Sequence, residues 1–301
     1  MFPNIGSGTT QQYLADLERN QAQLQTAEGQ VSSGLRIQQP SDDPAAVAEI
    51  LQTQAAIAGN NQIQSNLGNV KTEVDTADAA LQSAVQAVES AVSLAAQGAG
   101  TTVSADTRAN LAQQVAALQQ TLVGIGCTTV NGRYIFSGDQ DTQAPYQYDP
   151  TQPNGVQQLV TSASTRVIQS TDGTSFAVAK TAQEIFDSPT ASVFAAMQAL
   201  QTALATSSQP DIATASDSLK AADTYLNDQL AFYGNVENQV QGASDLAQKF
   251  QTEQQTQLSQ LQDTDIPTVA TELTQLQNQQ QSSMEVEATV SQMKNLFSFL
   301  A

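Results

Sequence analysis

The chain has 301 residues, of which 40% are apolar and 5% aromatic, with no tryptophan. Alanine, valine and leucine dominate the apolar residues, and because each buries little area this composition favours thin helical packing over one thick core. The formal net charge is −19 and the ten basic residues are spread along the chain. Nucleic acid and anionic membrane surfaces are therefore poor partner candidates, since phosphates are bound by clustered lysine and arginine.

Residues 1–44 carry the first amphipathic pattern. Leu17, Leu24 and Val31 are seven residues apart, and Leu14 lies on the adjoining edge. The positions between them are mostly polar, so a helix formed here is too polar to stay ordered alone. We expect this helix to need a helical partner.

The stretch RIQQPSDDPAAVA, residues 36–48, marks a helix stop and restart. A glycine and a proline end the first helix. Asp43 is placed to cap a second helix that begins at Pro44, where the missing N–H is not needed. Asp42 adds negative charge near the positive end of the dipole of that helix.

Residues 45–130 form the first half of a helical rod. Apolar residues recur in steps of three and four from Ile63 to Ala95, which predicts a long helix with gentle left-handed supercoiling. Two glycines then allow the chain to reverse, and Ser104 is expected to cap a second helix that runs antiparallel to the first.

Residues 131–187 change in character, with prolines, Asn-Gly and Asp-Gly pairs and short β-prone runs. We interpret them as an inserted, mainly-β domain. A hairpin with a tight two-residue turn is expected at Asp172 and Gly173, and a looser hairpin within residues 146–160.

Residues 188–250 return to helix and form the second half of the rod. Ser188 is expected to cap this helix and Pro189 to occupy its first position. After a break at Pro210, a long apolar seam runs over residues 219–240.

Residues 251–301 form a second terminal helix with mostly polar spacers, as in "QLQNQQQSSM". We expect this helix also to need a partner. The fold class is therefore mainly α with an inserted β domain: a long antiparallel helical bundle with terminal coiled-coil helices. The apolar positions of the C-terminal helix are Ile266, Val269, Leu273, Leu276, Val290, Met293 and Leu296.

The residue types leave little room for catalysis. Without histidine and with one cysteine, histidine-dependent triads and the usual zinc sites are excluded. The pairs Asp139/Asp141 and Asp263/Asp265 lack the calcium-loop pattern and are interpreted as loops or helix caps. We therefore predict no catalytic, cofactor-binding or metal-binding residues. Cys127 is interpreted as a small packing residue, with a reactive or intermolecular thiol as the alternative.

The first thirty residues contain no basic region followed by an apolar one, and no run approaches the roughly 18 apolar residues of a membrane span. We expect no membrane insertion and no cleaved leader. A cytosolic location, or export by a machine that reads another signal, remains open.

Three stretches, in order, resemble one known family. "VSSGLRIQQPSDDPAAVA", residues 31–48, resembles the N-terminal signature of the flagellin superfamily. "NGRYIFSG", residues 131–138, resembles the start of the middle domain in its hook-filament junction members, the hook-associated protein 3 family. Residues 263–301 are similar to the C-terminal helix of the superfamily.

The resemblance implies a structural protein of the bacterial flagellum rather than an enzyme, without a cofactor. It implies export through the flagellar channel without a cleaved signal peptide, with an export chaperone, and a ring of like subunits between another hook-associated protein and flagellin. The residues that we expect at subunit contacts are Leu14, Leu17, Leu24, Val31, Ile266, Val269, Leu273, Leu276, Val290, Met293 and Leu296.

Two other functions remain open. A minor flagellin would share both ends of the chain but would polymerise along the filament. A secreted coiled-coil binding module would instead use residues 131–187 to bind a sugar or a peptide.

Overall fold

The computed structural model describes the backbone of residues 6–300 and the side chains of residues 11–286, 288 and 289. The chain divides into two compact units, one made of residues up to Gly59 together with those from Gln251, the other of Asn60–Phe250. The main helices are α1 (Gly6–Ser33), α2 (Pro44–Gly98), α3 (Ala105–Gly126), α5 (Val193–Ala205), α6 (Gln209–Gln262) and α7 (Ile266–Leu300).

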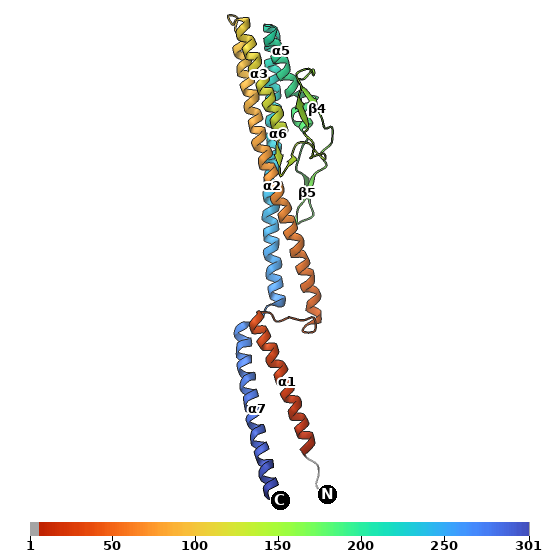
Figure 1. Cartoon of the computed structure of the whole chain (residues 1–301), viewed down its shortest axis with the longest axis vertical. Helices are drawn as coiled ribbons and strands as arrows, with labels where there is room; N and C mark the ends of the chain where they lie inside the picture. Colours follow the sequence, from red (N-terminus) through yellow and green to blue (C-terminus); the bar gives the residue numbers. More distant parts are fainter. Residues whose placement is uncertain (1–5, 301) are drawn as a thin grey trace. The chain divides into compact units, whose positions relative to one another are not determined.

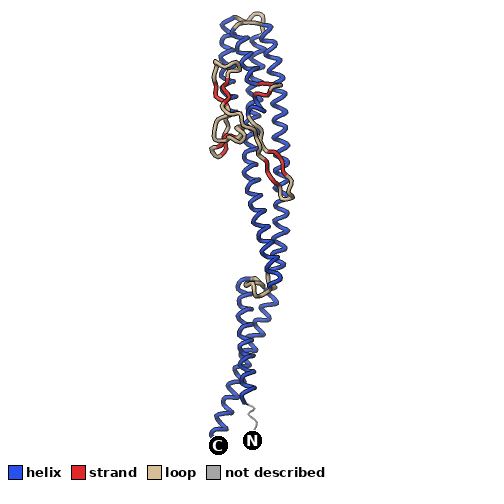
Figure 2. Tube along the Cα trace, turned by 90° about the vertical axis from the view of Figure 1, so that its right-hand side faces the viewer, coloured by secondary structure: helices blue, strands red, loops and turns tan. Residues whose placement is uncertain are grey.

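The second unit is a bundle in which α2, α3, α5 and α6 run side by side (Figures 1 and 2). The long helix predicted between Ile63 and Ala95 is confirmed as part of α2, and the seam predicted over residues 219–240 lies within α6. Both seams face the core, where Leu81, Val88 and Leu226 are fully buried. Helix pairing through steps of three and four residues thus builds the body of this unit.

The turn between α2 and α3 also matches its prediction. The Ser104 hydroxyl accepts a hydrogen bond from the N–H of Thr107 at 3.2 Å, as an N-cap does. The Arg108 side chain then reaches back across the turn and donates to the carbonyls of Gly98 and Gly100, each at 2.9 Å. The first of these bonds satisfies the carbonyl of Gly98, the last residue of α2, which has no partner within the helix, and the second holds the turn that follows.

The inserted segment contains short antiparallel strand pairs, which lie to one side of the bundle (Figures 1 and 2). A short helix, α4 (Ala182–Phe186), follows the third pair with a complete capping box at its start. The pairs are β1 (Thr129–Val130) with β2 (Arg133–Tyr134), β3 (Tyr146–Tyr148) with β4 (Val156–Gln158), β5 (Val167–Gln169) with β6 (Ser175–Ala177), and β7 (Asp187–Ser188) with β8 (Ala191–Ser192).

The looser hairpin predicted within residues 146–160 is confirmed by β3 and β4, and the hairpin at Asp172 and Gly173 by β5 and β6. The two-residue turn expected in the latter is wrong, because Gln169 pairs with Ser175 and residues 170–174 form the loop. The Asp172 carboxylate accepts hydrogen bonds from both the N–H and the hydroxyl of Thr174. This local bonding stabilises the wider loop.

The helix start predicted at Ser188 and Pro189 is also wrong. Ser188 pairs with Ala191, which places Pro189 in the turn between β7 and β8, where its fixed φ suits the second turn position. The cap of α5 is instead Ser192, whose hydroxyl accepts from the N–H of Ala195 at 3.1 Å. Ser192 also donates to the Asp187 carboxylate at 2.6 Å, which closes the small strand pair.

Phe136, within the "NGRYIFSG" stretch, anchors the inserted segment to the bundle. Its side chain is fully buried, and its ring meets those of Phe186 and Tyr233 edge to face at centroid distances of 6.1 and 6.3 Å. The Tyr233 hydroxyl accepts a hydrogen bond from the N–H of Lys180, and burial raises the pKa of Tyr233. The aromatic cluster therefore joins the insertion to α6 by apolar burial.

We predict that Phe136→Ala lowers the free energy of unfolding of the second unit by about 3–5 kcal/mol, because it removes a buried aromatic side chain and leaves a cavity. Urea denaturation measures this loss. Val167→Ala is the matched control, since Val167 is 61% exposed and its replacement should change stability little. A loss below about 1 kcal/mol for Phe136→Ala would mean that the cluster does not hold the insertion.

Candidate assembly interface

The first unit pairs the two ends of the chain. Helices α1 and α7 lie side by side and antiparallel (Figures 1 and 2). At one end of the pair, Leu35 forms an antiparallel bridge with Asp263, and the N–H of Arg36 donates to the Gln262 carbonyl at 2.7 Å. Gly34 has φ +74°, a left-handed conformation that glycine adopts readily as α1 ends.

A small apolar cluster, which we call the terminal seam, holds α1 against α7. Its members are buried or half-buried and come from both helices, so the pairing is stabilised by apolar burial. The structure brings together five of the eight predicted contact residues whose side chains it describes, and adds an alanine. The terminal seam consists of Leu24, Ala27, Val31, Val269, Leu273 and Leu276.

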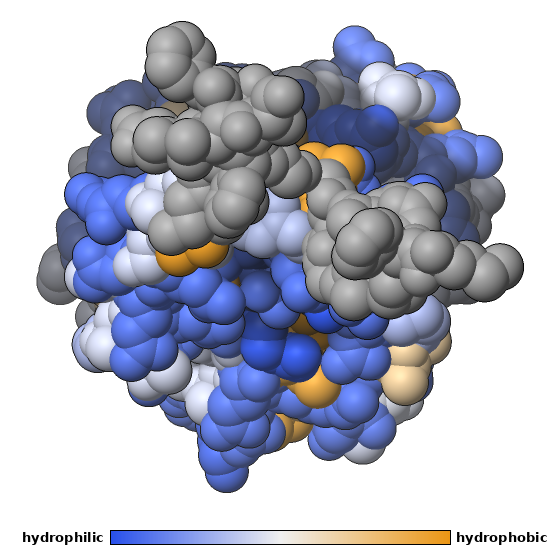
Figure 3. All heavy atoms as spheres, turned by 90° about the horizontal axis from the view of Figure 1, so that it is seen from below, coloured by the Kyte–Doolittle hydropathy of each residue, from blue (hydrophilic) through white to orange (hydrophobic). Residues whose placement is uncertain are grey.

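The other predicted contact residues do not join the terminal seam. Leu17 is half-buried, whereas Leu14 and Ile266 are 49% and 40% exposed. Figure 3 shows a described surface that is mainly hydrophilic, with small, separate hydrophobic patches. The side chains of Val290, Met293 and Leu296 lie outside the part of the chain that the structure describes.

Sequence reasoning missed two residues that shape this pair. Ala27 is only 5% exposed, and it completes the alternation of threes and fours between Leu24 and Val31, which is the signal that could have identified it. Tyr13 donates a hydrogen bond from its hydroxyl to the Ser283 carbonyl at 2.5 Å. No local pattern identifies this second contact, since it depends on the register of the two helices.

The restart segment combines a helix cap with a local hydrogen-bond network. The Asp43 carboxylate accepts from the N–H of Ala46 at 3.2 Å, and α2 begins at Pro44. The Asp42 carboxylate accepts from the N–H groups of Gln38 and Gln39 at 2.9 and 2.8 Å, and these bonds hold the pKa of Asp42 below its usual value. Asp42 thus stabilises the loop before the helix by direct bonds, in addition to any effect on the dipole.

Arg36 connects this segment to the end of α6. Its guanidinium donates to the Leu261 carbonyl at 2.9 Å and lies 3.5 Å from the Asp43 carboxylate. The backbone bond matters more than the ion pair, because both charged groups are partly exposed and such pairs contribute little. The loop between α1 and α2 is thereby held against the loop between α6 and α7.

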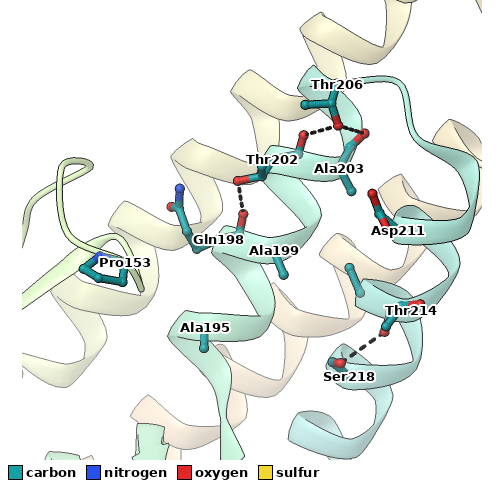
Figure 4. Close-up of a pocket in the computed structure, with 11 residues that line it drawn as sticks. Pro153, Ala195, Gln198, Ala199, Thr202, Ala203, Thr206, Asp211, Thr214 and Ser218 are labelled. Atoms are coloured by element: carbon teal, nitrogen blue, oxygen red, sulfur yellow. Dashed lines mark hydrogen bonds between the residues drawn. The ribbon is translucent and has the colours of Figure 1, made fainter.

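The second unit contains a surface groove whose hydroxyl groups are engaged within their own helices. A groove of about 410 Å³ between α5 and α6 is lined largely by alanine and threonine (Figure 4). The hydroxyls of Thr202, Thr206 and Ser218 already donate to carbonyls of their own helices. Among the described residues, no three histidine, cysteine or carboxylate side chains are grouped as metal ligands.

The acidic pairs are engaged in loops and helix caps. Asp139 accepts hydrogen bonds from Thr165, and Asp141 pairs with Arg133 at 2.9 Å. Asp263 accepts from Ser259, and Asp265 from Thr268. The Cys127 thiol donates to the Tyr146 carbonyl at 3.3 Å, and burial raises the pKa of the thiol, which favours a packing role over a reactive one.

None of the described helices contains an apolar stretch long enough to cross a membrane.

Residues 7–141 match the family model described as the bacterial flagellin N-terminal helical region. The chain is 28% identical over 187 residues to flagellar hook-associated protein 3 of Escherichia coli (strain K12), and 29% identical over 163 residues to the protein of that name from Salmonella typhimurium (strain LT2). The matches cover 62% and 52% of this chain, and 57% and 51% of those proteins. The chain thus spans about half the length of the curated relatives it matches.

Solved structures share the fold at low sequence identity. A putative flagellar hook-associated protein of Vibrio parahaemolyticus aligns with a TM-score of 0.66 and 18% identity, over 74% of this chain and all of that one. The flagellar junction protein of Legionella pneumophila aligns with a TM-score of 0.57 and 14% identity, over 71% of this chain and 99% of that one.

The cap at the start of α2 can be tested by substitution. We predict that Asp43→Ala costs about 0.5–2 kcal/mol of local stability, because the N–H of Ala46 loses its partner. Asp43→Asn retains a capping oxygen, and its local stability should be close to that of the unsubstituted chain. Amide exchange over residues 44–50 measures the difference. Equal losses in both variants would show that the charge facing Arg36, and not the cap, stabilises this helix start.

Proposed function

We propose that the chain is a member of the flagellin superfamily, which it resembles over residues 7–141, and that it is a structural protein of the bacterial flagellum that joins the hook to the filament by helical assembly. The observation that carries the proposal is the terminal seam, which pairs the two ends of the chain through an apolar cluster of their own, distinct from the core of the second unit. Support also comes from the two curated relatives, both named flagellar hook-associated protein 3.

The terminal helices are suited to association with further copies. Large apolar side chains on α1 and α7 stay exposed in the single chain: Leu14, Ile266, Met284 and Val286 are each at least 40% accessible. Covering them in a ring of like subunits would stabilise the assembly by roughly 25 cal/mol for each Å² of apolar surface removed from water. The predicted contact residues of both ends would serve this purpose.

The remaining partners follow from the same proposal. One face of the ring meets another hook-associated protein and the other meets flagellin, and the chain reaches this place by export without a cleaved signal peptide, assisted by a chaperone. The inner domain comprises residues 1–44 and 251–301. The rod comprises residues 45–130 and 188–250, and the outer domain residues 131–187.

The location of the protein tests the proposal directly. Antibody against this chain, viewed by electron microscopy on flagellated cells of the source bacterium, should label only the base of each filament. Labelling along the filament would favour a minor flagellin. Labelling unconnected with flagella, together with a sugar or peptide ligand for residues 131–187, would favour a secreted binding module.

A charge placed in the terminal seam should separate assembly from folding. Leu276 is 7% exposed, and Leu276→Asp would bury a carboxylate at high desolvation cost. No lysine or arginine lies between Lys249 and Lys294, and Arg19 of the facing helix is exposed and already pairs with Asp16. We predict that filaments detach into the medium, while the melting temperature of the second unit stays unchanged. Flagellin released to the medium and thermal unfolding measure the two effects.

Gln277→Asp is the matched control, since Gln277 is exposed on the next position of the same helix. It should leave filaments attached. Normal swimming in the Leu276→Asp strain would contradict the role of the terminal seam, and a large fall in melting temperature would place the seam in the stability core of the monomer.

A further inference from the structure

Asn20 lies on the face of α1 that meets α7. Only 6% of its surface is exposed, and neither its Oδ1 nor its Nδ2 atom has a hydrogen-bond partner among the residues that the structure describes. Nearly all buried polar atoms in folded proteins are paired, and an enclosed amide without partners reduces stability. Packing within one chain therefore does not explain this residue.

Two contacts fix the register of the helix pair around Asn20. Leu35 bridges to Asp263, shortly before α7, at one end, and the Tyr13 hydroxyl donates to the Ser283 carbonyl toward the other. This antiparallel register places Asn20 near Leu276, the last residue of the terminal seam on α7. Beyond Leu276, the half-buried residues of α7 are the polar Gln280 and Ser283.

In this part of the helix pair a polar side chain is buried and apolar side chains are exposed, which is the reverse of the arrangement that stabilises a single chain in water. The Asn20 amide is enclosed, whereas Leu14, Met284 and Val286 are 49%, 52% and 56% exposed. Further helices that covered these apolar side chains and offered amide partners would correct both features at once. The helix pair is thus incomplete within one chain.

We propose, on the basis of the proposed ring assembly, that Asn20 sets the register in which the terminal helices of neighbouring copies pack, by hydrogen bonding through its amide to a second copy of this chain. An amide both donates and accepts, so an identical chain can supply its partners. A single buried asparagine in a helical seam specifies register and oligomeric state at a cost in stability. Because the amide is enclosed within one chain, α1 must shift against α7 as copies join.

The test replaces Asn20 with leucine in the full-length chain. Asn20→Leu removes the unpaired amide, so the pairing of α1 with α7 in dilute solution should strengthen about tenfold or more, measured as slower amide exchange over residues 20–31. In cells the variant should still be exported, but filaments should be attached about tenfold less often, because the register is no longer specified.

Two further variants serve as controls. Gln23→Leu adds the same apolar side chain at an exposed position of α1, and it should change neither exchange nor filament number. Asn20→Gln keeps a side-chain amide and should retain attached filaments. If Asn20 acted by packing alone, loss of the amide in Asn20→Leu would not reduce filament attachment.

Each alternative outcome bears on the proposal. Unchanged or weaker pairing in Asn20→Leu would show that the amide is satisfied within one chain, and would overturn it. Stronger pairing together with normal filaments would leave Asn20 as a packing defect, and would overturn it as well. If antibody labelling places the chain elsewhere than the filament base, the proposed function fails, independently of the role of Asn20. The assembly of the same Asn20 variants is then measured in the structure that the antibody labels.

Discussion

The pairing of the two chain ends through six side chains is the interaction on which the first unit depends. The terminal seam contains four buried residues, including one alanine, whereas the core of the second unit continues along α2, α3, α5 and α6 and includes an aromatic cluster. Since stability grows with apolar area buried, the second unit can hold itself together, whereas the terminal helices would gain most from the contacts with other copies that we propose.

The loop between α1 and α2 makes this pairing geometrically available. Asp42 bonds the loop backbone, Asp43 caps α2, and Arg36 binds the carbonyl of Leu261 at the end of α6. These polar contacts contribute modestly to stability, but they bring α1 and α7 to the same place in the first unit. A chain with few charged residues thus uses several of them to direct its own path.

Regular features could be predicted from the sequence, and long-range ones could not. The α2 seam between Ile63 and Ala95 and the Ser104 cap follow from spacing and local chemistry. The choice of Ser192 over Ser188 as the cap of α5 depends on the β7–β8 pair, which a local pattern does not show. The burial of Asn20 had a usable signal, because it continues the seam spacing, but its polar side chain concealed that position.

The central claim is that the terminal helices serve assembly and do not belong to the stable core of the monomer. Amide hydrogen exchange on the full-length chain in dilute solution tests this claim most directly. The account predicts that residues 11–33 and 266–286 exchange at least about a hundredfold faster than residues 67–95, because few buried contacts protect them. Protection of the terminal helices equal to that of residues 67–95 would contradict it.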